Sequence, residues 1–479
     1  MLAATEGTRC PARPRAAPRV PRVDRRALPV VRAPRSSDPL RLRSRAVATT
    51  TRRNVVVAAS AESSRDGNVE SKRRYVNFTG FPFPLVPFLS RRTVVNEVVK
   101  GKVWTLEQEQ GIGFDLGVST NVRCTIVKMR DGRLWVHDPI APTGECVEAI
   151  EAIGGDVAYV VLATTQYEHK IFAGPFARKF PDAEVWIAPG QFSFPVQLPP
   201  QFFGIFPTGT IADENMPWAK EIDTKLLRLP SLFWGNYTYC EAGFYHKDSR
   251  SVLVTDAAVY VDDAPPEVIP RPSLVDLGAP DGFTISLLRA LDFRGGRTLP
   301  GADATRADPD ACAKVGWKRM ALFSLFIAPD AKNILQPEAS FAALAGKFVV
   351  SPIVYVIVFQ HYRKEVLTWV NAIGRDWGGA DRVIGAHFPV CERNAIKKRP
   401  GIGGMFGARS MTNPFDSVRG GGAGGGSNAG GTPVKRFTRA FAWAATAADA
   451  PAEYVDVDDL ASLELVARFA RFVRAVPRA

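Results

Sequence analysis

The chain has 479 residues, a length that allows two or three domains. Its formal net charge is +13, but residues 1–58 contain fourteen arginines and only three acids, so this stretch carries +11 of that total. The rest of the chain carries only +2, which excludes a broad basic surface for DNA or RNA outside the N-terminus.

Residues 1–58 are rich in Arg, Ala, Pro, Val and Ser and poor in acids, which is the composition of an organelle transit peptide. The stretch ends in Val56-Val57-Ala58-Ala59, a pattern similar to the V-x-A/A sequence of stromal processing sites. We therefore expect a chloroplast protein whose mature form begins near Ala59. A disordered basic tail with another purpose is the alternative.

Residues 59–100 are expected to form an N-terminal arm. Between Phe78 and Phe88, prolines 82, 84 and 87 exclude a regular helix and a central strand. No apolar run in the chain reaches the roughly eighteen residues of a membrane span. The longest run, Phe348 to Phe359, contains both a serine and a proline.

The first part of the expected domain, residues 101–395, alternates strands with helices. An Asp-Gly pair between two β-rich runs predicts a hairpin, and an amphipathic segment follows it. The predicted elements are strands at 103–107, 121–128 and 133–137 and a helix at 144–153.

The stretch from Val157 to Ala188 reads as strand, polar loop, helix and strand, the βαβ pattern of a layered α/β domain. The helix is expected from Phe172 to Phe180, so Glu168 and His169 fall on the loop after the first strand, where functional side chains often lie. A carboxylate next to an imidazole there can be a pair of metal ligands, a general acid/base pair or a plain hydrogen bond.

Three more strands, several helices and a late strand complete the expected domain. A polar turn that includes His246 joins two of the strands, of which the second is expected to end at Asp256, and the late strand delivers His387. The predicted strands are 225–229, 237–245, 251–255 and 382–385, and the predicted helices are 285–291, 317–327, 338–348 and 363–373.

The remainder is a Gly-rich insert at 396–434, which is expected to be a flexible linker, and a C-terminal helical segment at 435–479. An apolar face from Asp458 to Val473 predicts the last helix. Six cysteines without C-x-x-C spacing favour reduced core residues over disulfides or a zinc finger.

This order resembles the four-layer αββα sandwich of metallo-β-lactamase-like proteins. It is more closely similar to a plastid and cyanobacterial family of unknown function related to that superfamily. The similarity covers Tyr75 to about Val390. The phrases that carry it are YVNFTGFPFPLVPFLSRRTVV, GKVWTLEQEQGIGF, LWVHDPIAPT, YEHKIFAGPFARKFPDAEVWIAPGQ, SVLVTDA and RVIGAHFPV.

The resemblance implies which residues occupy the metal-site positions. The superfamily motif H-x-H-x-D-H is matched by residues 164–169, where Thr164 and Gln166 replace the first two histidines. Neither is a good zinc ligand. No histidine is present near 237–241 for the third, so the first metal site looks dismantled.

The second site is better preserved, and its positions are occupied by Glu168, His169, Asp256 and His387. These residues would hold at most one divalent metal, Zn, Fe or Mn. Asp138 falls where the superfamily places an acid that orients a ligand histidine. Without a metal, the four residues would form a buried hydrogen-bonded network.

Two functions follow from the resemblance. The first is a hydrolase in which Glu168 and Asp256 take catalytic roles beside one metal. The second is a non-catalytic binding or assembly factor, with Phe/Pro-rich loops as its contact surface. The partner is expected to be a small molecule or a protein. Of the other histidines, His137 is expected in the core, His246 in solvent and His361 at a helix end.

Overall fold

The computed structural model describes residues 69–76, 85–112, 117–193, 197–229, 238–286, 308–325, 337–393, 431–441 and 444. Contacts divide the chain into Met1–Ser60 and Ala61–Ala479, and every described residue belongs to the second unit. The expected transit peptide, most of the Gly-rich insert and the expected helix from Asp458 to Val473 lie outside the described residues.

The first sheet has eight strands, antiparallel from β1 to β5 and parallel from β5 to β8. The Asp-Gly turn joins β4 to β5 as predicted, and Gly132 has the positive φ of 87° that this turn requires. The strands are β1 (Leu85–Val86), β2 (Thr93–Val99), β3 (Val103–Ile112), β4 (Ser119–Lys128), β5 (Leu134–His137), β6 (Val157–Leu162), β7 (Glu184–Ile187) and β8 (Gly209–Thr210).

The second sheet has five strands in the order β15, β14, β11, β10, β9. The β11 and β14 strands are parallel, and the other neighbours are antiparallel. A separate two-stranded sheet pairs β12 with β13. Their bounds are β9 (Ile222–Arg228), β10 (Cys240–His246), β11 (Ser251–Leu253), β12 (Val259–Tyr260), β13 (Phe348–Val349), β14 (Arg382–Ile384) and β15 (Cys391–Glu392).

Three of the described helices, α2, α6 and α11, begin at a residue whose side chain caps them. The Thr143 side chain accepts a hydrogen bond from the backbone of Cys146 and caps α2. In the described part of the chain, no helix combines the length and apolarity needed to cross a membrane. The helices are α2 (Gly144–Ile153), α3 (Tyr167–Ala177), η1 (Pro200–Phe203), α4 (Arg271–Gly278), α6 (Pro309–Ser324), α8 (Glu338–Leu344), α9 (Pro352–Ile357), η2 (Phe359–His361), α10 (Arg363–Trp377) and α11 (Pro433–Arg439).

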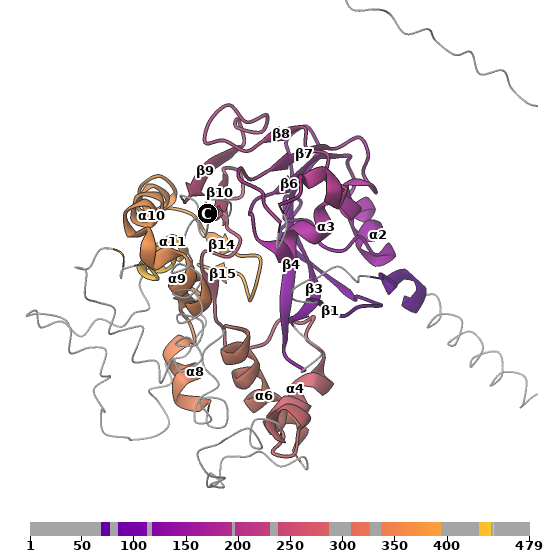
Figure 1. Ribbon diagram of the computed structural model, residues 1–479, viewed down its shortest axis with the longest axis vertical. Coiled ribbons are helices and arrows are strands. Elements are labelled where there is room, and N and C mark those ends of the chain that lie inside the picture. Colours follow the sequence, from indigo (N-terminus) through magenta and orange to yellow (C-terminus); the bar gives the residue numbers. More distant parts are fainter. Residues whose placement is uncertain are drawn as a thin grey trace, which may run out of the picture. The chain divides into compact units, whose positions relative to one another are not determined.

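Three apolar clusters show that the elements form four layers. One lies between α2, α3 and the outer face of the first sheet, and includes Val122 and Phe176. A second lies between the two sheets, where Trp135 meets Phe244. A third lies between the second sheet and α10 with α11. Figure 1 shows α2 and α3 on one outer side of the paired sheets and α10 and α11 on the other. The fold is the predicted αββα sandwich.

Most predicted strands and helices are present, with several corrections to their bounds. The helix α3 begins at Tyr167 rather than Phe172, so Glu168 and His169 lie in its first turn and not on a loop. The strand β11 ends at Leu253, and Asp256 lies in the bend that follows it. Within the expected arm, β2 is a full strand of the first sheet because it pairs along β3.

Candidate metal centre

Three segments that are distant in the sequence end at the same edge of the sandwich. Glu168 and His169 follow β6, Asp256 follows β11, and His387 follows β14. The β6 strand is parallel to its neighbours, and β11 is parallel to β14. These are therefore carboxyl ends of parallel strands, where α/β proteins bind ligands.

The structure brings the four expected site residues together. One potential ligand atom from each of Glu168, His169, Asp256 and His387 lies within 4.8 Å of all the others. Asp256 Oδ1 is 3.4 Å from His169 Nε2 and 3.2 Å from His387 Nε2. His169 is fully buried, whereas the His387 side chain is 13% exposed. The cluster is therefore open to solvent on the His387 side.

The contacts that join these side chains are long: Asp256 Oδ1 shares a hydrogen bond of 3.4 Å with His169 Nε2 and lies 3.2 Å from His387 Nε2. Charge-assisted N–H···O bonds measure about 2.7–2.9 Å, and both distances from Asp256 to the imidazoles are longer. Asp256 Oδ2 and His169 Nδ1 are buried and have no hydrogen-bond partner among the described residues. Because buried polar atoms normally have partners, an unpartnered carboxylate oxygen beside two imidazoles fits a cation site.

The charges in the cluster also favour a cation. Burial raises the pKa of Glu168, and the neighbouring Asp256 carboxylate raises it further. Burial alone would raise the pKa of Asp256, but the imidazoles of His169 and His387 lower it. Burial alone would lower the pKa of His169, but the Asp256 carboxylate raises it to about 10. The neighbouring carboxylates therefore attract positive charge to the cluster, which either a protonated imidazole or a divalent ion in its place would supply.

His387 is oriented by a backbone group of the first sheet. Its Nδ1 lies 2.6 Å from the carbonyl oxygen of Asn121. A carbonyl only accepts hydrogen bonds, so Nδ1 carries the proton and donates it. When the imidazole is neutral, Nε2 therefore carries no proton, and its lone pair faces Asp256. Metal-binding histidines are commonly oriented in this way.

Glu241, a buried residue of β10 that sequence reasoning did not select, fixes the backbone around Asp256. Its carboxylate accepts hydrogen bonds from the backbone nitrogens of Thr255 and Asp256 at 2.8 and 3.0 Å, and from the Tyr239 hydroxyl at 2.8 Å. Burial and then the Asp256 charge raise the pKa of Glu241 to about 8. A single acidic residue within a mostly apolar strand sequence was the signal that could have identified Glu241.

Asp138 differs from the expected role of orienting a ligand histidine. Its two carboxylate oxygens accept hydrogen bonds from the Ala163 backbone at 2.9 Å and from the Thr255 hydroxyl at 2.6 Å. Asp138 therefore bonds the segment that leads into α3 and the residue that precedes Asp256. Asp138 supports the cluster through the backbone rather than through an imidazole.

The other candidate positions do not join the cluster. The Thr164 hydroxyl accepts a hydrogen bond from the Gln166 backbone. His137 is buried and stacked on Trp135, as expected for a core residue. The prediction that His246 is solvated is wrong, because His246 ends β10 inside the protein and contacts the Ser249 hydroxyl at 2.8 Å.

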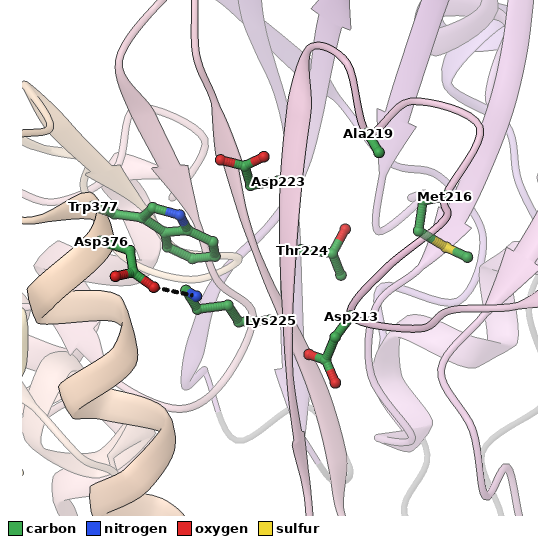
Figure 2. Close-up of a pocket in the computed structure, with 8 residues that line it drawn as sticks. All are labelled: Asp213, Met216, Ala219, Asp223, Thr224, Lys225, Asp376 and Trp377. Carbon is green, nitrogen blue, oxygen red and sulfur yellow. Dashed lines mark hydrogen bonds and ion pairs between the residues drawn. The ribbon is translucent and has the colours of Figure 1, made fainter.

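A surface pocket of about 340 Å³ lies elsewhere, between β9 and α10 (Figure 2). Its three carboxylates already have partners. Asp213 accepts from the Leu226 backbone, Asp223 pairs with Lys247, and Asp376 pairs with Lys225. None of the four clustered residues lines this pocket. The chemistry of the donor set, rather than the size of a pocket, identifies the candidate site.

The four layers and the cluster at one edge define a metallo-β-lactamase-like domain with one candidate metal centre. The family described as "Domain of unknown function (DUF4336)" matches residues 100–343 and 335–399. The chain belongs to this family. No curated protein matches the chain.

Solved structures with the metallo-β-lactamase fold are similar to this chain at low sequence identity. A metallo-β-lactamase from Pontibacter korlensis has 10% identity and a TM-score of 0.32, with 63% of this chain and 94% of that chain covered. FIM-1 from Pseudomonas aeruginosa, in a mono-zinc form, has 9% identity and a TM-score of 0.33, with coverage of 63% and 90%. The metal-soaked Flv1 flavodiiron core from Synechocystis sp. has 8% identity and a TM-score of 0.34, with coverage of 64% and 59%.

Proposed function

We propose that this protein binds one divalent metal ion through Glu168, His169, Asp256 and His387 and acts as a metal-dependent hydrolase. The observation that carries the proposal is the meeting of four donors from three distant segments around a buried Asp256 oxygen without a partner. Two imidazoles and two carboxylates suit Zn²⁺, Fe²⁺ or Mn²⁺. Such an ion would lower the pKa of a bound water to near neutrality.

The position of each residue indicates the role that it would take beside the metal ion. His169 is fully buried and fixed in the first turn of α3, so it serves as an anchor. Asp256 lies between the two imidazoles and offers its second oxygen. Glu168 is partly exposed and its pKa is raised by burial and by the Asp256 carboxylate, so it is the carboxylate of the cluster placed to exchange a proton with solvent.

Metal content of the purified protein tests the proposal. After chelation and reloading with Zn²⁺, Fe²⁺ or Mn²⁺, we expect about one ion per chain by elemental analysis. His169→Ala and His387→Ala should lose the ion, because each removes an imidazole donor. Thr164→Ala, at a position whose hydroxyl bonds only backbone in the described structure, should retain it.

Equal metal content in the wild type and both histidine variants would contradict the metal proposal. If the wild type binds no ion under any loading condition, a non-catalytic binding or assembly factor becomes the better description. A specific observation favours that second candidate. Phe202 and Phe206, in the loop between β7 and β8, are each 69% exposed and offer an apolar contact surface.

We also propose that the chain functions in the chloroplast. The support is the composition of residues 1–58, which combines fourteen arginines with three acids and ends in the processing-like Val56-Val57-Ala58.

A further inference from the structure

Three buried side chains of the first sheet face the loop that carries His387. Side chains alternate along β4, so Val122 points to the outer helices while Asn121 and Arg123 point to the second sheet. Glu107 of β3 lies directly opposite Arg123 in the antiparallel ladder. All three polar residues are at most 5% exposed.

Arg123 connects the first sheet to the loop on both sides of His387. Its Nε donates to Glu107 Oε1 at 2.9 Å, and its two terminal nitrogens donate to the carbonyl oxygens of Gly385 and Phe388. The Glu107 carboxylate compensates the buried charge. The planar guanidinium can therefore bridge two carbonyls that lie three residues apart.

Asn121 holds the same loop from the adjacent position. Its Oδ1 accepts from the Phe388 backbone nitrogen at 2.6 Å, and its Nδ2 donates to Glu107 Oε2 at 3.0 Å. Its carbonyl oxygen accepts from His387 Nδ1. One residue thus fixes both the ring of His387 and the backbone that follows it.

The loop adopts a conformation that needs such support. Phe388 has φ of 60°, a left-handed value that is uncommon for a bulky residue and is strained. Both of its backbone polar groups are bonded by the first sheet, its nitrogen to Asn121 and its oxygen to Arg123. These bonds compensate the strain at the residue next to His387.

We propose that Glu107, Asn121 and Arg123 form an inter-sheet clamp that positions His387 in the metal centre. The clamp residues do not contact the ion, and they act by holding one donor from the second sheet against the other three. The part of this inference that concerns the metal rests on the proposed function. The alternative is an ion pair that only stabilises the fold.

The Zn²⁺ affinity of matched variants distinguishes a clamp that positions His387 from an ion pair that only stabilises the fold. Asn121→Ala removes the side-chain bonds to the loop without a change in charge. Arg123→Lys keeps the charge beside Glu107 but loses the fork that spans two carbonyls. For both variants we expect Zn²⁺ affinity, measured by competition with a chelating dye, to fall about tenfold to hundredfold.

Val122→Ala is the matched control, because it truncates a fully buried core side chain between the two clamp residues but on the opposite face. It should lower the unfolding temperature yet keep the affinity for Zn²⁺. An equal loss of Zn²⁺ affinity in Val122→Ala, or an unchanged affinity in both Asn121→Ala and Arg123→Lys, would overturn the positioning role.

Hydrogen exchange of the metal-free protein tests the clamp independently of any ion. Peptides that cover 385–390 should exchange at least tenfold faster in Asn121→Ala and Arg123→Lys than in the wild type or Val122→Ala. Unchanged exchange would reject the clamp even if the wild type binds zinc. Faster exchange in the two variants, together with a wild type that binds no ion, would reject only the proposed function.

Discussion

His246 is a buried imidazole outside the metal centre, and its surroundings make it a pH-sensitive residue. Burial lowers the pKa of His246 to about 4, so the folded protein holds the ring neutral while the unfolded chain protonates it near pH 6.5. A depressed pKa means that its contribution to stability is present above about pH 6.5 and is lost as the pH falls toward 4. The loss between pH 7 and pH 5 is about 2 kcal/mol.

We therefore expect His246→Asn to be less stable than the wild type at pH 7 but to lose less stability on acidification. Asparagine can still bond the Ser249 hydroxyl but does not titrate. Urea unfolding of both proteins at pH 7 and pH 5 measures the difference. The exposed His361→Asn serves as the control and should follow the wild type. Parallel losses in all three proteins would refute the role of His246.

The candidate donors could be predicted from the sequence, whereas the residues that support them could not. The resemblance drawn from the sequence selected Glu168 and His169 through one short motif and Asp256 and His387 through the strands that precede them, and the structure brings the four together. Glu241 and Arg123 act through hydrogen bonds to segments 14 and more than 200 residues away. Such pairs depend on sheet register and loop conformation, and a strand sequence contains no direct sign of either.

At the level of elements, α4 and α6 pack unusually closely because each presents a glycine to the other. A Cβ atom at Gly316 of α6 would lie 1.8 Å from the Leu274 carbonyl oxygen, and one at Gly278 of α4 would lie 1.8 Å from the Cys312 carbonyl oxygen. Arg319 of α6 also donates to the carbonyls of Leu277 and Gly278 at the end of α4. Backbone therefore meets backbone at this contact.

Gly316→Ala should destabilise the protein by about 2 kcal/mol or more, because neither backbone can move without separation of the helices. This sign is opposite to the usual gain of up to about 1 kcal/mol when alanine replaces a glycine inside a helix. Gly374→Ala in α10 is the control, since its Cβ would meet only a Thr438 methyl group at 3.2 Å. Chemical unfolding of both variants measures the contrast, and equal stability would contradict the close packing.

Alternating and continuous apolar runs predicted most strands, because each strand of the sandwich buries one or both of its faces. The start of α3 was missed, since Glu168 and His169 are polar and gave no apolar period although both lie in the helix. The β2 strand was missed because only one of its seven residues is buried at this sheet edge, so it shows no apolar alternation. Both errors arise where tertiary contacts rather than local pattern decide the conformation.

In the unit that contains all described residues, the candidate metal centre lies where the two sheets meet. His169 comes from the helix that follows β6 of the first sheet, whereas Asp256 and His387 come from the segments that follow β11 and β14 of the second sheet. The inter-sheet apolar cluster and the clamp at Glu107, Asn121 and Arg123 hold these pieces in place. The site is thus a property of the whole sandwich and not of one loop.

At the scale of the whole molecule, the positive charge is concentrated near the N-terminus. Residues 1–58 hold +11 of the net +13, so their removal leaves a chain that is close to neutral. We expect residues 1–60 to direct a fluorescent reporter to chloroplasts and the mature N-terminus to lie near Ala59. Replacing the arginines of 1–58 by glutamine should abolish import, because the basic, acid-poor composition is the targeting feature. A mature protein that retains Met1 to Thr50, or a reporter that stays outside the organelle, would refute the prediction, whereas the metal centre is unaffected by either result.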